Sequence, residues 1–465
     1  MTLDCNLNIN TRENSSTKTY VVLVSTLAYF ILISFTGCKP NQIGEKTDKK
    51  TIVSLWVKWE GSERNAIERL VDQYNQSQEK NFVRILSVSD PKKKLMLAIA
   101  NGHPPDLAYL FYFILPAYAE NNALTPLDSL FEQYRIEKDD FTPSCLDAVT
   151  HKGFIWGIPT TSTATALHYN KSLLNKADIE SLATPKTLEE LEAINDRLFV
   201  ANEIGKIQQM GFLPIEPDWW LSEWAFWFGG EVFNNDKLQI NMPAWKDCSE
   251  WLASYPNRFG ASDLMKFKSS FGGFASSQNA FFTGKVAMVH QGMWMENFVQ
   301  SYASPNFEYG IAPMPAAKSS GLPYVSIIEP DTLCIPRGAK HVAEAMDFVK
   351  FLLKRENLEQ LALGQRKLTS LSDVSLDFLE KHPHPFIHEF QQIASSPYSR
   401  SRPKLPYYGK YQSDIKEAFT GIFFERSEIE DALNKATQKQ QESLDKNQKR
   451  WNRVSSSRIK EWSQL

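Results

Sequence analysis

Cys38 is the residue whose surroundings most directly predict a chemical step. A run without charged residues extends from Thr19 to Gly37, and the small residues Thr36 and Gly37 stand directly before the cysteine. A peptidase that cuts here needs small side chains before the cut, and the new amino-terminal thiol can then take a lipid. We therefore predict a lipoprotein signal over residues 1–37 and lipid attachment at Cys38. The alternative is an uncleaved membrane helix, because the apolar run is near the lower limit of about 17 residues.

Patterns for catalysis or metal binding are weaker. Residues 382–389 contain three histidines (His382, His384 and His388) and Glu389, a density that could bind a metal, but the prolines between them favour an exposed, extended loop. Acidic pairs such as Asp139 with Asp140 have no spacing that requires a glycosidase, and no Gly-x-Ser-x-Gly elbow occurs. No Gly-Lys pair is followed by Ser or Thr in a phosphate-binding loop, so ATP hydrolysis would need a partner. We predict no enzyme activity, no cofactor and no metal.

Length and composition set the scale of the fold that carries these residues. The chain has 465 residues, a net charge of −3 and 12 Trp. Residues 38–50 are polar and are predicted to form a flexible tether, and the remaining chain is long enough for two lobes. The weak net charge implies no attraction to nucleic acid. Among the cysteines, Cys145, Cys248 and Cys334 form an odd set without close spacing, which favours buried free thiols but leaves one disulfide possible.

Periodicity predicts alternating strands and helices. Residues 51–57 alternate as a strand, residues 62–76 have helical spacing, and Asp90 followed by Pro91 indicates the start of a second helix. The apolar run 107–115, closed by Pro116, suggests a buried strand. This order predicts a mostly parallel α/β sheet, in which ligands bind at the carboxyl ends of strands. Residues 435–460 suggest a solvated final helix.

Several segments, in this order, resemble the extracellular solute-binding proteins of ABC transporters, in the carbohydrate-binding group similar to maltose-binding protein. The segments are 102–106 (GHPPD), 153–159 (GFIWGIP), 167–174 (LHYNKSLL), 185–191 (PKTLEEL), 282–288 (FTGKVAM), 292–294 (GMW), 309–315 (YGIAPMP) and 335–340 (IPRGAK). The resemblance spans about residues 51–440. It implies the periplasmic-binding-protein-like α/β fold of class II, with two α/β lobes around a hinged interlobe cleft.

The resemblance also implies where the lobes and crossings fall. Lobe 1 is expected over residues 51–163 and 312–354, and lobe 2 over residues 164–311 and 355–465. The chain would cross between the lobes near Thr163, Ile311 and Lys354. Closure of the lobes would bury the ligand and present a surface that a permease distinguishes from the open form.

Sugar recognition explains the residue types expected in this cleft. A sugar has apolar faces ringed by hydroxyl groups, so flat aromatic side chains and hydrogen-bonding carboxylates suit it. The resemblance places Trp219 where related proteins carry a stacking aromatic residue, and Trp294 in a turn that directs an aromatic residue into the cleft. Helical spacing over residues 218–230 would place Trp220, Trp224 and Trp227 on one face. Trp220 is either ligand-binding or core, whereas Trp224 and Trp227 are predicted to be core.

Further candidates come from loops and crossings. These ligand-binding candidates are Trp59, Glu60, Asp106, Trp156, Thr160, Ser162, Thr163, Glu329, Asp331, Tyr408 and Tyr411. Glu60 could instead be a helix-terminal charge, and Asp106 a structural cap. Thr163 stands where maltose-type binders carry an acidic residue, which puts maltodextrin specificity in doubt. Glu329 and Asp331 could equally be solvated loop charges.

These observations predict the substrate-binding lipoprotein of an ABC importer, which captures a sugar or oligosaccharide and delivers it to the permease. Its partners would be a small carbohydrate, permease subunits with a separate ATPase, and the membrane through the lipid anchor; we expect a monomer. We expect export, with the chain facing the periplasm or the exterior. The alternatives are a binder of a non-sugar solute or metal and, from the enzyme class, a surface-anchored glycosidase.

Overall fold

A computed structural model of the chain describes residues 50–179, 184–234 and 237–465. Residues Lys50–Leu465 form a unit of their own, separate from Met1–Lys49. The predicted signal, the lipid site at Cys38 and the tether up to residue 49 lie outside the described residues.

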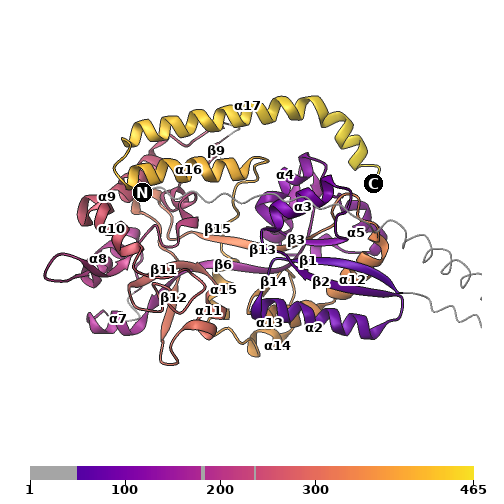
Figure 1. Ribbon diagram of the computed structural model, residues 1–465, viewed down its shortest axis with the longest axis horizontal. Helices are drawn as coiled ribbons and strands as arrows, with labels where there is room; N and C mark the ends of the chain where they lie inside the picture. Colours follow the sequence, from indigo (N-terminus) through magenta and orange to yellow (C-terminus); the bar gives the residue numbers. More distant parts are fainter. Residues whose placement is uncertain (1–49, 180–183, 235–236) are drawn as a thin grey trace, which may run out of the picture. The chain divides into compact units, whose positions relative to one another are not determined.

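The described chain begins with alternating strands and helices. In order they are β1 (Thr51–Val57), α2 (Gly61–Ser77), β2 (Asn81–Ser87), α3 (Pro91–Ala100) and β3 (Leu107–Phe111). β1 pairs in parallel with both β2 and β3. Alternate residues of β1 are fully buried and pack with the apolar face of α2, and α2 and α3 lie on opposite sides of these strands (Figure 1). The predicted first strand and both predicted helices are therefore confirmed.

The apolar run 107–115 is only partly a strand, which corrects the sequence prediction. β3 ends at Phe111, and the chain then forms a 3₁₀ turn (η1, Tyr112–Ile114) and the helix α4 (Leu115–Glu120). Pro116 lies in the first turn of α4, where its missing N–H is not needed. The proline therefore starts a helix here and does not simply close a strand.

Two long strands, β6 (Ile158–Asn170) and β13 (Ser326–Cys334), form the centre of the sheet. Among the described residues, eleven strands join in one sheet whose main path is β2-β1-β3-β13-β6-β11-β8-β7. β6 and β13 are antiparallel to each other, with Thr163 opposite Glu329, and β13 is antiparallel to β3. The sheet is therefore mixed: the predicted parallel pairing holds for β1 to β3 and for β8 with β11, but not at the centre.

The other elements surround these strands. The remaining strands are β4 (Thr150–His151), β5 (Phe154–Ile155), β7 (Val200–Ala201), β8 (Ile207–Phe212), β9 (Phe233–Asn234), β10 (Lys237–Leu238), β11 (Val286–Gly292), β12 (Tyr309–Ala312), β14 (Leu368–Thr369) and β15 (Ser399–Arg400). The helices up to α11 are α5 (Asp128–Tyr134), η2 (Lys138–Asp140), α6 (Pro143–Val149), α7 (Lys171–Lys176), α8 (Leu188–Leu198), α9 (Pro243–Phe259), α10 (Ala261–Lys268) and α11 (Met295–Tyr302). Those that follow are η5 (Lys318–Ser320), α12 (Val342–Leu352), α13 (Arg355–Gln365), α14 (Leu376–Glu380), α15 (Ile387–Ala394), α16 (Tyr408–Phe423) and α17 (Ile429–Trp462).

The tryptophan-rich segment is not the continuous helix that its spacing suggested. It forms two short 3₁₀ helices, η3 (Asp218–Trp220) and η4 (Trp224–Phe228). The break sends neighbouring rings in different directions. Trp224 and Trp227 are buried in the core, as predicted.

Buried apolar side chains form two clusters that β6 and β13 connect. Ile158 and Leu333 belong to the smaller cluster, with β1 to β3, whereas Ala164 and Ile328, on the same two strands, belong to the larger one. The clusters divide the chain at other points than the predicted lobes do. Buried residues between 312 and 328 pack in the larger cluster, and those of α13 and the last turns of α17 pack in the smaller one. The lobe limits themselves stay a prediction.

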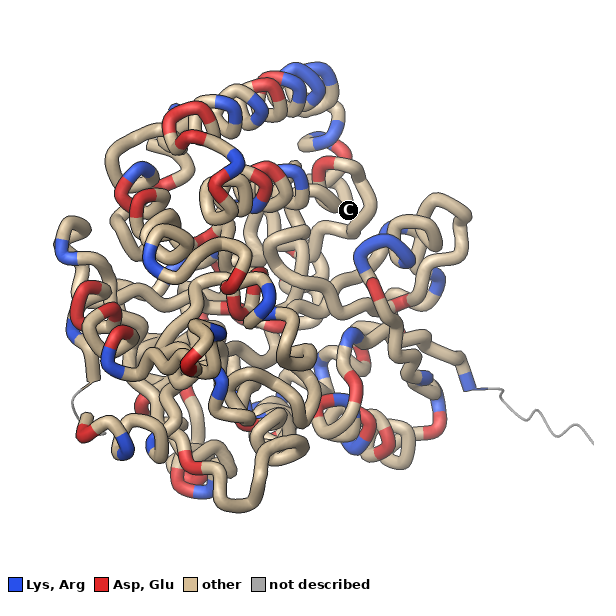
Figure 2. The backbone as a smooth tube through the Cα atoms, turned by 60° about the vertical axis from the view of Figure 1, so that its left-hand side comes forward, with Lys and Arg blue, Asp and Glu red and all other residues tan. Residues whose placement is uncertain are grey.

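Three further observations concern the described residues alone. None of their helices has the length and apolar character that crossing a bilayer requires. Cys145, Cys248 and Cys334 are buried free thiols, which is the state that the sequence favoured. Charged residues are spread over the outer helices, with α17 densely charged (Figure 2).

Candidate functional site

A cavity of about 780 Å³ lies between the two buried clusters, with the central strands contributing to its wall. Its lining residues are Lys58, Trp59, Glu60, Gly61, Ser62, Glu63, Phe111, Tyr112, Phe113, Thr163, Trp219, Trp220, Phe274, Ala275, Trp294, Asn297, Phe298, Ser301, Tyr302, Glu329, Pro330, Asp331, Lys367, Arg402 and Gln412. Small-molecule sites have volumes of about 300 to 1,000 Å³, so this cavity is among the larger ones.

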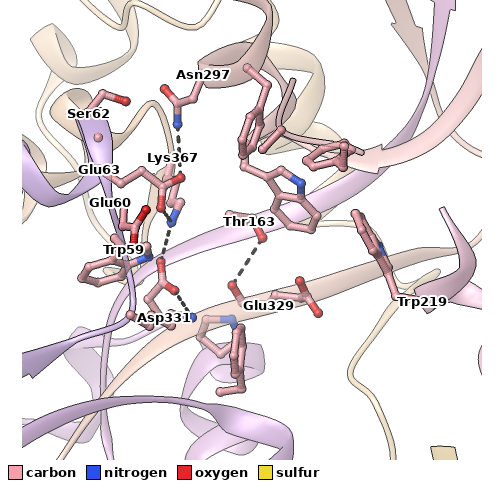
Figure 3. Close-up of a pocket in the computed structure, with 18 of the residues that line it drawn as sticks. Trp59, Glu60, Ser62, Glu63, Thr163, Trp219, Asn297, Glu329, Asp331 and Lys367 are labelled. Carbon is pink, nitrogen blue, oxygen red and sulfur yellow. Dashed lines mark hydrogen bonds and ion pairs between the residues drawn. The ribbon is translucent and has the colours of Figure 1, made fainter. Parts of the chain in front are cut away.

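Eight of the predicted ligand-binding residues line this cavity. They are Trp59, Glu60, Thr163, Trp219, Trp220, Trp294, Glu329 and Asp331. They come from the loop after β1, from β6 and β13, from η3, and from the turn between β11 and α11. Figure 3 shows Trp219 across the cavity from Trp59 and Asp331.

One wall of the cavity is aromatic. The rings of Trp220 and Trp294 are nearly parallel, with centroids 6.4 Å apart, and Trp219 meets Phe274 edge-on at 5.1 Å. Trp220 is almost fully buried, and its indole N–H donates to the carbonyl of His290 at 2.8 Å. Trp220 therefore serves as support for the wall, while Trp219 and Trp294 are only partly buried and offer ring surface to a ligand.

The opposite wall is ionic and centres on Asp331. Its carboxylate lies 2.8 Å from the Lys58 ammonium and 2.9 Å from the Lys367 ammonium, and it accepts a hydrogen bond from the Thr161 hydroxyl. Burial raises the pKa of Asp331, but Lys367 and Lys58 lower it more, so the pKa lies well below its ordinary value. Asp331 is therefore ionised, and neither lysine beside it is an uncompensated charge.

The same ion-pair network reaches the other side of the cavity. Lys367 also pairs with Glu63 of α2 at 3.0 Å, and the amide of Asn297 in α11 donates to the Glu63 carboxylate at 3.2 Å. Arg366 donates to the Asn297 side-chain oxygen at 2.9 Å. A polar bridge thus joins α2, which packs in the smaller cluster, to α11, which lies beside the aromatic wall (Figure 3).

A second charged group surrounds Arg402. Its guanidinium pairs with Glu329 and with the fully buried Glu223, and it lies over the rings of Phe113 and Trp220 at 4.9 and 5.2 Å. Burial alone would lower the pKa of Arg402, but Glu329 and the other acidic neighbours have the larger effect, and the pKa is raised above its ordinary value. The group is therefore a permanent cation. Arg402 therefore holds the Glu329 carboxylate at the edge of the cavity.

Six predicted ligand-binding residues do not line the cavity. Asp106 has a structural role, because its carboxylate accepts hydrogen bonds from the backbone N–H and the hydroxyl of Ser54 and from the backbone N–H of His341. Trp156 is fully buried and packs edge-on against Trp462 at 4.7 Å. Asp106 therefore has the contacts of a structural cap, and Trp156 is packed in the core.

The other four are buried near the cavity but have protein partners. The hydroxyls of Thr160 and Ser162 donate to the backbone carbonyls of Asp331 and Thr369. Tyr408 donates to Glu223 at 2.6 Å, and the Tyr411 hydroxyl donates to the carbonyl of Ser222 at 3.0 Å. Side-chain direction on a strand or helix, which the sequence alone could not resolve, accounts for these misplacements.

The histidine-rich segment is only partly the exposed loop that its prolines suggested, because His388 and Glu389 are exposed whereas His382 and His384 are not. His384 is almost fully buried, and one nitrogen of its ring lies 3.1 Å from the carbonyl of Met293. His382 lies 3.0 Å from the carbonyl of Lys367. Within the described ranges, no group of three or more His, Cys, Asp or Glu residues is placed to hold a metal ion. These histidines position backbone segments beside the cavity.

Sequence reasoning missed several residues of the cavity. Lys58, Glu63, Asn297, Lys367 and Arg402 carry its charges and polar bridges, yet none was predicted to bind ligand. Lys58 had a signal, because it directly precedes the predicted Trp59 and Glu60. Lys367 had none, since 36 residues separate it from Asp331.

Comparison with known proteins decides the family. A profile described as bacterial extracellular solute-binding protein matches residues 60–359, well over half of the chain. The chain belongs to this family. Its fold is the class II periplasmic-binding-protein fold, with two α/β lobes around a hinged cleft, as the sequence predicted. Members of the family bind solutes outside the cell membrane, and this chain is therefore an extracellular solute-binding protein.

Curated relatives are similar over much of their length. An uncharacterized ABC transporter extracellular-binding protein of Pyrococcus horikoshii is 23% identical over 351 residues, which cover 71% of this chain and 76% of that protein. The maltodextrin-binding protein MdxE of Bacillus subtilis is 26% identical over 304 residues, covering 62% and 66% of the two chains. The sn-glycerol-3-phosphate-binding periplasmic protein UgpB of Yersinia pestis is 23% identical, covering 66% and 71%.

Solved structures share the fold. The protein CpMnBP1 with mannobiose bound superposes with a TM-score of 0.74 at 25% identity, covering 84% of this chain and 100% of that one. The maltose/maltodextrin-binding domain MalE of Bdellovibrio bacteriovorus, bound to maltotriose, has a TM-score of 0.69 at 16% identity, covering 85% and 100%.

Proposed function

We propose that this extracellular solute-binding protein is the lipid-anchored receptor of an ABC importer for a neutral sugar or short oligosaccharide. The ligand enters between the lobes, the lobes close over it, and the closed form delivers it to the membrane permease. The observation that carries the proposal is the cavity with one aromatic and one ionic wall.

The two walls suit the two kinds of surface on a sugar. Trp219 and Trp294 offer flat ring area to the apolar faces of pyranose rings. Across from them, Glu60, Glu329 and Asp331 offer carboxylate oxygens to hydroxyl groups. A cavity of about 780 Å³ leaves room for more than one sugar ring. The mannobiose and maltodextrin ligands in the names of similar proteins agree with this size class.

Charge favours a neutral ligand over a phosphate ester. The three cations that line the cavity are all paired: Lys58 with Asp331, Lys367 with Asp331 and Glu63, and Arg402 with Glu329 and Glu223. An anionic ligand would have to displace a carboxylate or leave a charge buried without a partner, which is costly. The sn-glycerol-3-phosphate in the name of one relative is therefore not the ligand we expect here.

The site also lacks the arrangement for glycoside hydrolysis. A glycosidase needs one carboxyl group that keeps its proton near neutral pH and a second that is ionised. Lys367 and Lys58 outweigh burial and hold the pKa of Asp331 well below its ordinary value, and the Glu63 and Glu329 carboxylates are each paired with a cation. We therefore propose binding without catalysis.

We propose the partners and the cellular location from the sequence. The lipid on Cys38 would keep the monomeric receptor at the membrane, facing the periplasm or the exterior, beside permease subunits and a separate ATPase. We propose that the lobes meet within β6, within β13 and between α13 and β14, where the buried residues change from one cluster to the other.

Calorimetric titration of the purified chain, residues 39–465, tests the function. We expect saturable binding of mannobiose, mannotriose or maltotriose and a raised unfolding temperature. Ligand at about 100 times its Kd adds ~2.7 kcal/mol to the free energy of unfolding.

Glycerol 3-phosphate and divalent metals serve as the contrasting ligands. Saturable binding of the phosphate ester, with no response to any sugar, would overturn the sugar proposal. A response to a metal alone would do the same. Release of a shorter sugar during incubation would contradict the absence of catalysis.

A further inference from the structure

The last helix of the chain, α17, touches both buried clusters. It runs for 34 residues, Ile429–Trp462, or ~51 Å at 1.5 Å per residue. Ala432, Leu433 and Ala436 near its start belong to the larger cluster, whereas Trp451 and Trp462 belong to the smaller one. Figure 1 shows α17 running past α16 toward the side of the molecule that holds β1 and α5. One continuous helix therefore spans both halves of the sheet.

The first part of α17 is fixed to its neighbours in the larger cluster. It packs on α16 and α9. The buried Gln440 donates to the Asp414 carboxylate of α16 at 2.7 Å, and Lys439 pairs with Glu417 at 2.7 Å. These contacts hold the helix up to Gln440.

The last part of α17 is fixed by an aromatic cluster. Trp462 packs edge-on against Trp156 at 4.7 Å and against Phe154 at 5.5 Å, and it is nearly parallel to Trp451. Trp462 is almost fully buried, and its indole N–H donates to Asn122 at 3.2 Å. The sequence suggested Trp156 as a ligand-binding residue. In the structure its ring instead packs against the end of this helix.

Charged and amide groups add specific contacts at the same end. Glu120, a buried carboxylate, accepts from Asn447 at 3.1 Å and pairs with Arg450 at 3.3 Å, while His151 lies 3.0 Å from its other oxygen. Glu461 of α17 pairs with Arg337. The docking therefore combines buried aromatic area with matched polar partners.

Between these two ends the helix has no buried residue. Residues 441–446, which precede the contacts of Asn447 and Arg450 with Glu120, are exposed or half-buried over ~9 Å of helix. The middle of α17 is a free span that keeps its length because an α-helix resists compression and extension. Its two ends are docked on the two bodies whose relative movement opens and closes the cleft.

We infer that α17 is a clasp that restricts how far the two lobes can move apart or together. While both ends are docked, the span fixes the separation of the two docking sites. Movement beyond the range that the docked helix tolerates requires the Trp462 end to leave its site on Trp156. The inference rests on the hinge movement of the fold and not on the identity of the ligand.

An insertion in the free span tests whether the rigid helix between the two docking sites, and not the docking itself, restricts the movement of the lobes. A short glycine–serine segment between the exposed residues Asp445 and Lys446 leaves both docking sites intact but removes the rigid link. Spin labels on Glu79→Cys and Lys266→Cys report the separation of the lobes by pulsed electron resonance. Both positions are exposed; Glu79 lies between α2 and β2, which pack in the smaller cluster, and Lys266 lies in α10, which packs in the larger one. Without ligand, we expect a broader distance distribution in the insertion variant than in the parent chain.

The matched control is Lys446→Ala with Lys449→Ala, which changes exposed residues next to the insertion point and keeps the helix. We expect it to give the parent distribution. Thermal unfolding checks docking: the insertion variant should unfold close to the parent, and Trp462→Ala should unfold at a lower temperature. Equal distributions for parent, control and insertion variant would overturn the clasp, and so would equal broadening by control and insertion. Failure to bind any sugar would leave this result unaffected, so the two proposals fail separately.

Discussion

Trp219 and Trp294 reach the cavity for different local reasons. Trp219 lies in η3, and Phe274 supports its ring from one edge. Trp294 follows β11, and the buried Trp220 lies behind it, with its own N–H satisfied by a backbone carbonyl. A ring that is already supported loses little conformational freedom when a ligand stacks on it. The binding contribution of these two rings is therefore expected to be large.

Replacing either ring tests this at the scale of one residue. Trp294→Ala and Trp219→Ala should each weaken sugar binding by about 2 kcal/mol, or ~30-fold in Kd, because a truncated central tryptophan commonly costs this much. Trp294→Phe, which keeps a flat ring, should lose less. Calorimetric titration gives the Kd values, and thermal unfolding without ligand checks that the variants are folded. An unchanged Kd in both alanine variants would remove the aromatic wall from the binding site.

At the scale of elements, the turn between β11 and α11 sets the direction of the aromatic wall. Gly292 ends β11, and a Cβ atom at this position would overlap the six-membered ring of Trp294. Glycine is needed here for space, since the indole lies directly against the backbone. The short sequence Gly-Met-Trp therefore contains both the ring and the gap that accommodates it.

Gly292→Ala should displace the Trp294 indole and weaken sugar binding nearly as much as Trp294→Ala. In a chain that already carries Trp294→Ala, adding Gly292→Ala should change the Kd little, because the overlap no longer exists. A double-mutant cycle by titration measures this coupling. Equal losses in the two backgrounds would show that Gly292 acts independently of the ring.

At the scale of the whole molecule, buried histidines make stability depend on pH. Burial lowers the pKa of His168 to about 3, of His384 to about 3 and of His382 to about 4, and it lowers that of His290 well below its ordinary value. In the unfolded chain these groups titrate near 6.5. The stability is therefore fully present above about pH 6.5 and is lost as the pH falls toward the folded values. The raised pKa of buried Glu223 acts in the opposite direction.

Urea unfolding at about pH 7.5 and at about pH 5 should reveal this dependence, with a loss of up to ~1.4 kcal/mol per pH unit for each buried histidine below 6.5. His384→Gln should reduce the slope, because it removes one group that gains a proton on unfolding. His103→Gln, at an exposed position, is the matched control and should leave the slope unchanged. A stability that rises on acidification over this range would contradict the assignment.

The sequence predicted helices and strands correctly where their formation depends on periodicity and capping within the segment itself. β1, α2 and α3 follow from alternation, helical spacing and the Asp90–Pro91 start, and the order of short motifs along the chain indicates the family. The apolar run after Leu107 and the tryptophan-rich segment were assigned less well. There, packing decided between strand, helix and 3₁₀ turn, and periodicity in a uniformly apolar segment carries little information.

The chain's own sequence determined the α/β class, the family and the types of residue that a sugar cleft needs, because each of these depends on local order and composition. Only the tertiary structure decided which of them share a cavity. Asp331 and Lys367, or Trp156 and Trp462, meet through contacts between segments that lie far apart in the chain. Side-chain direction then separated Trp294, which faces the cavity, from Tyr408, which bonds to Glu223 behind it.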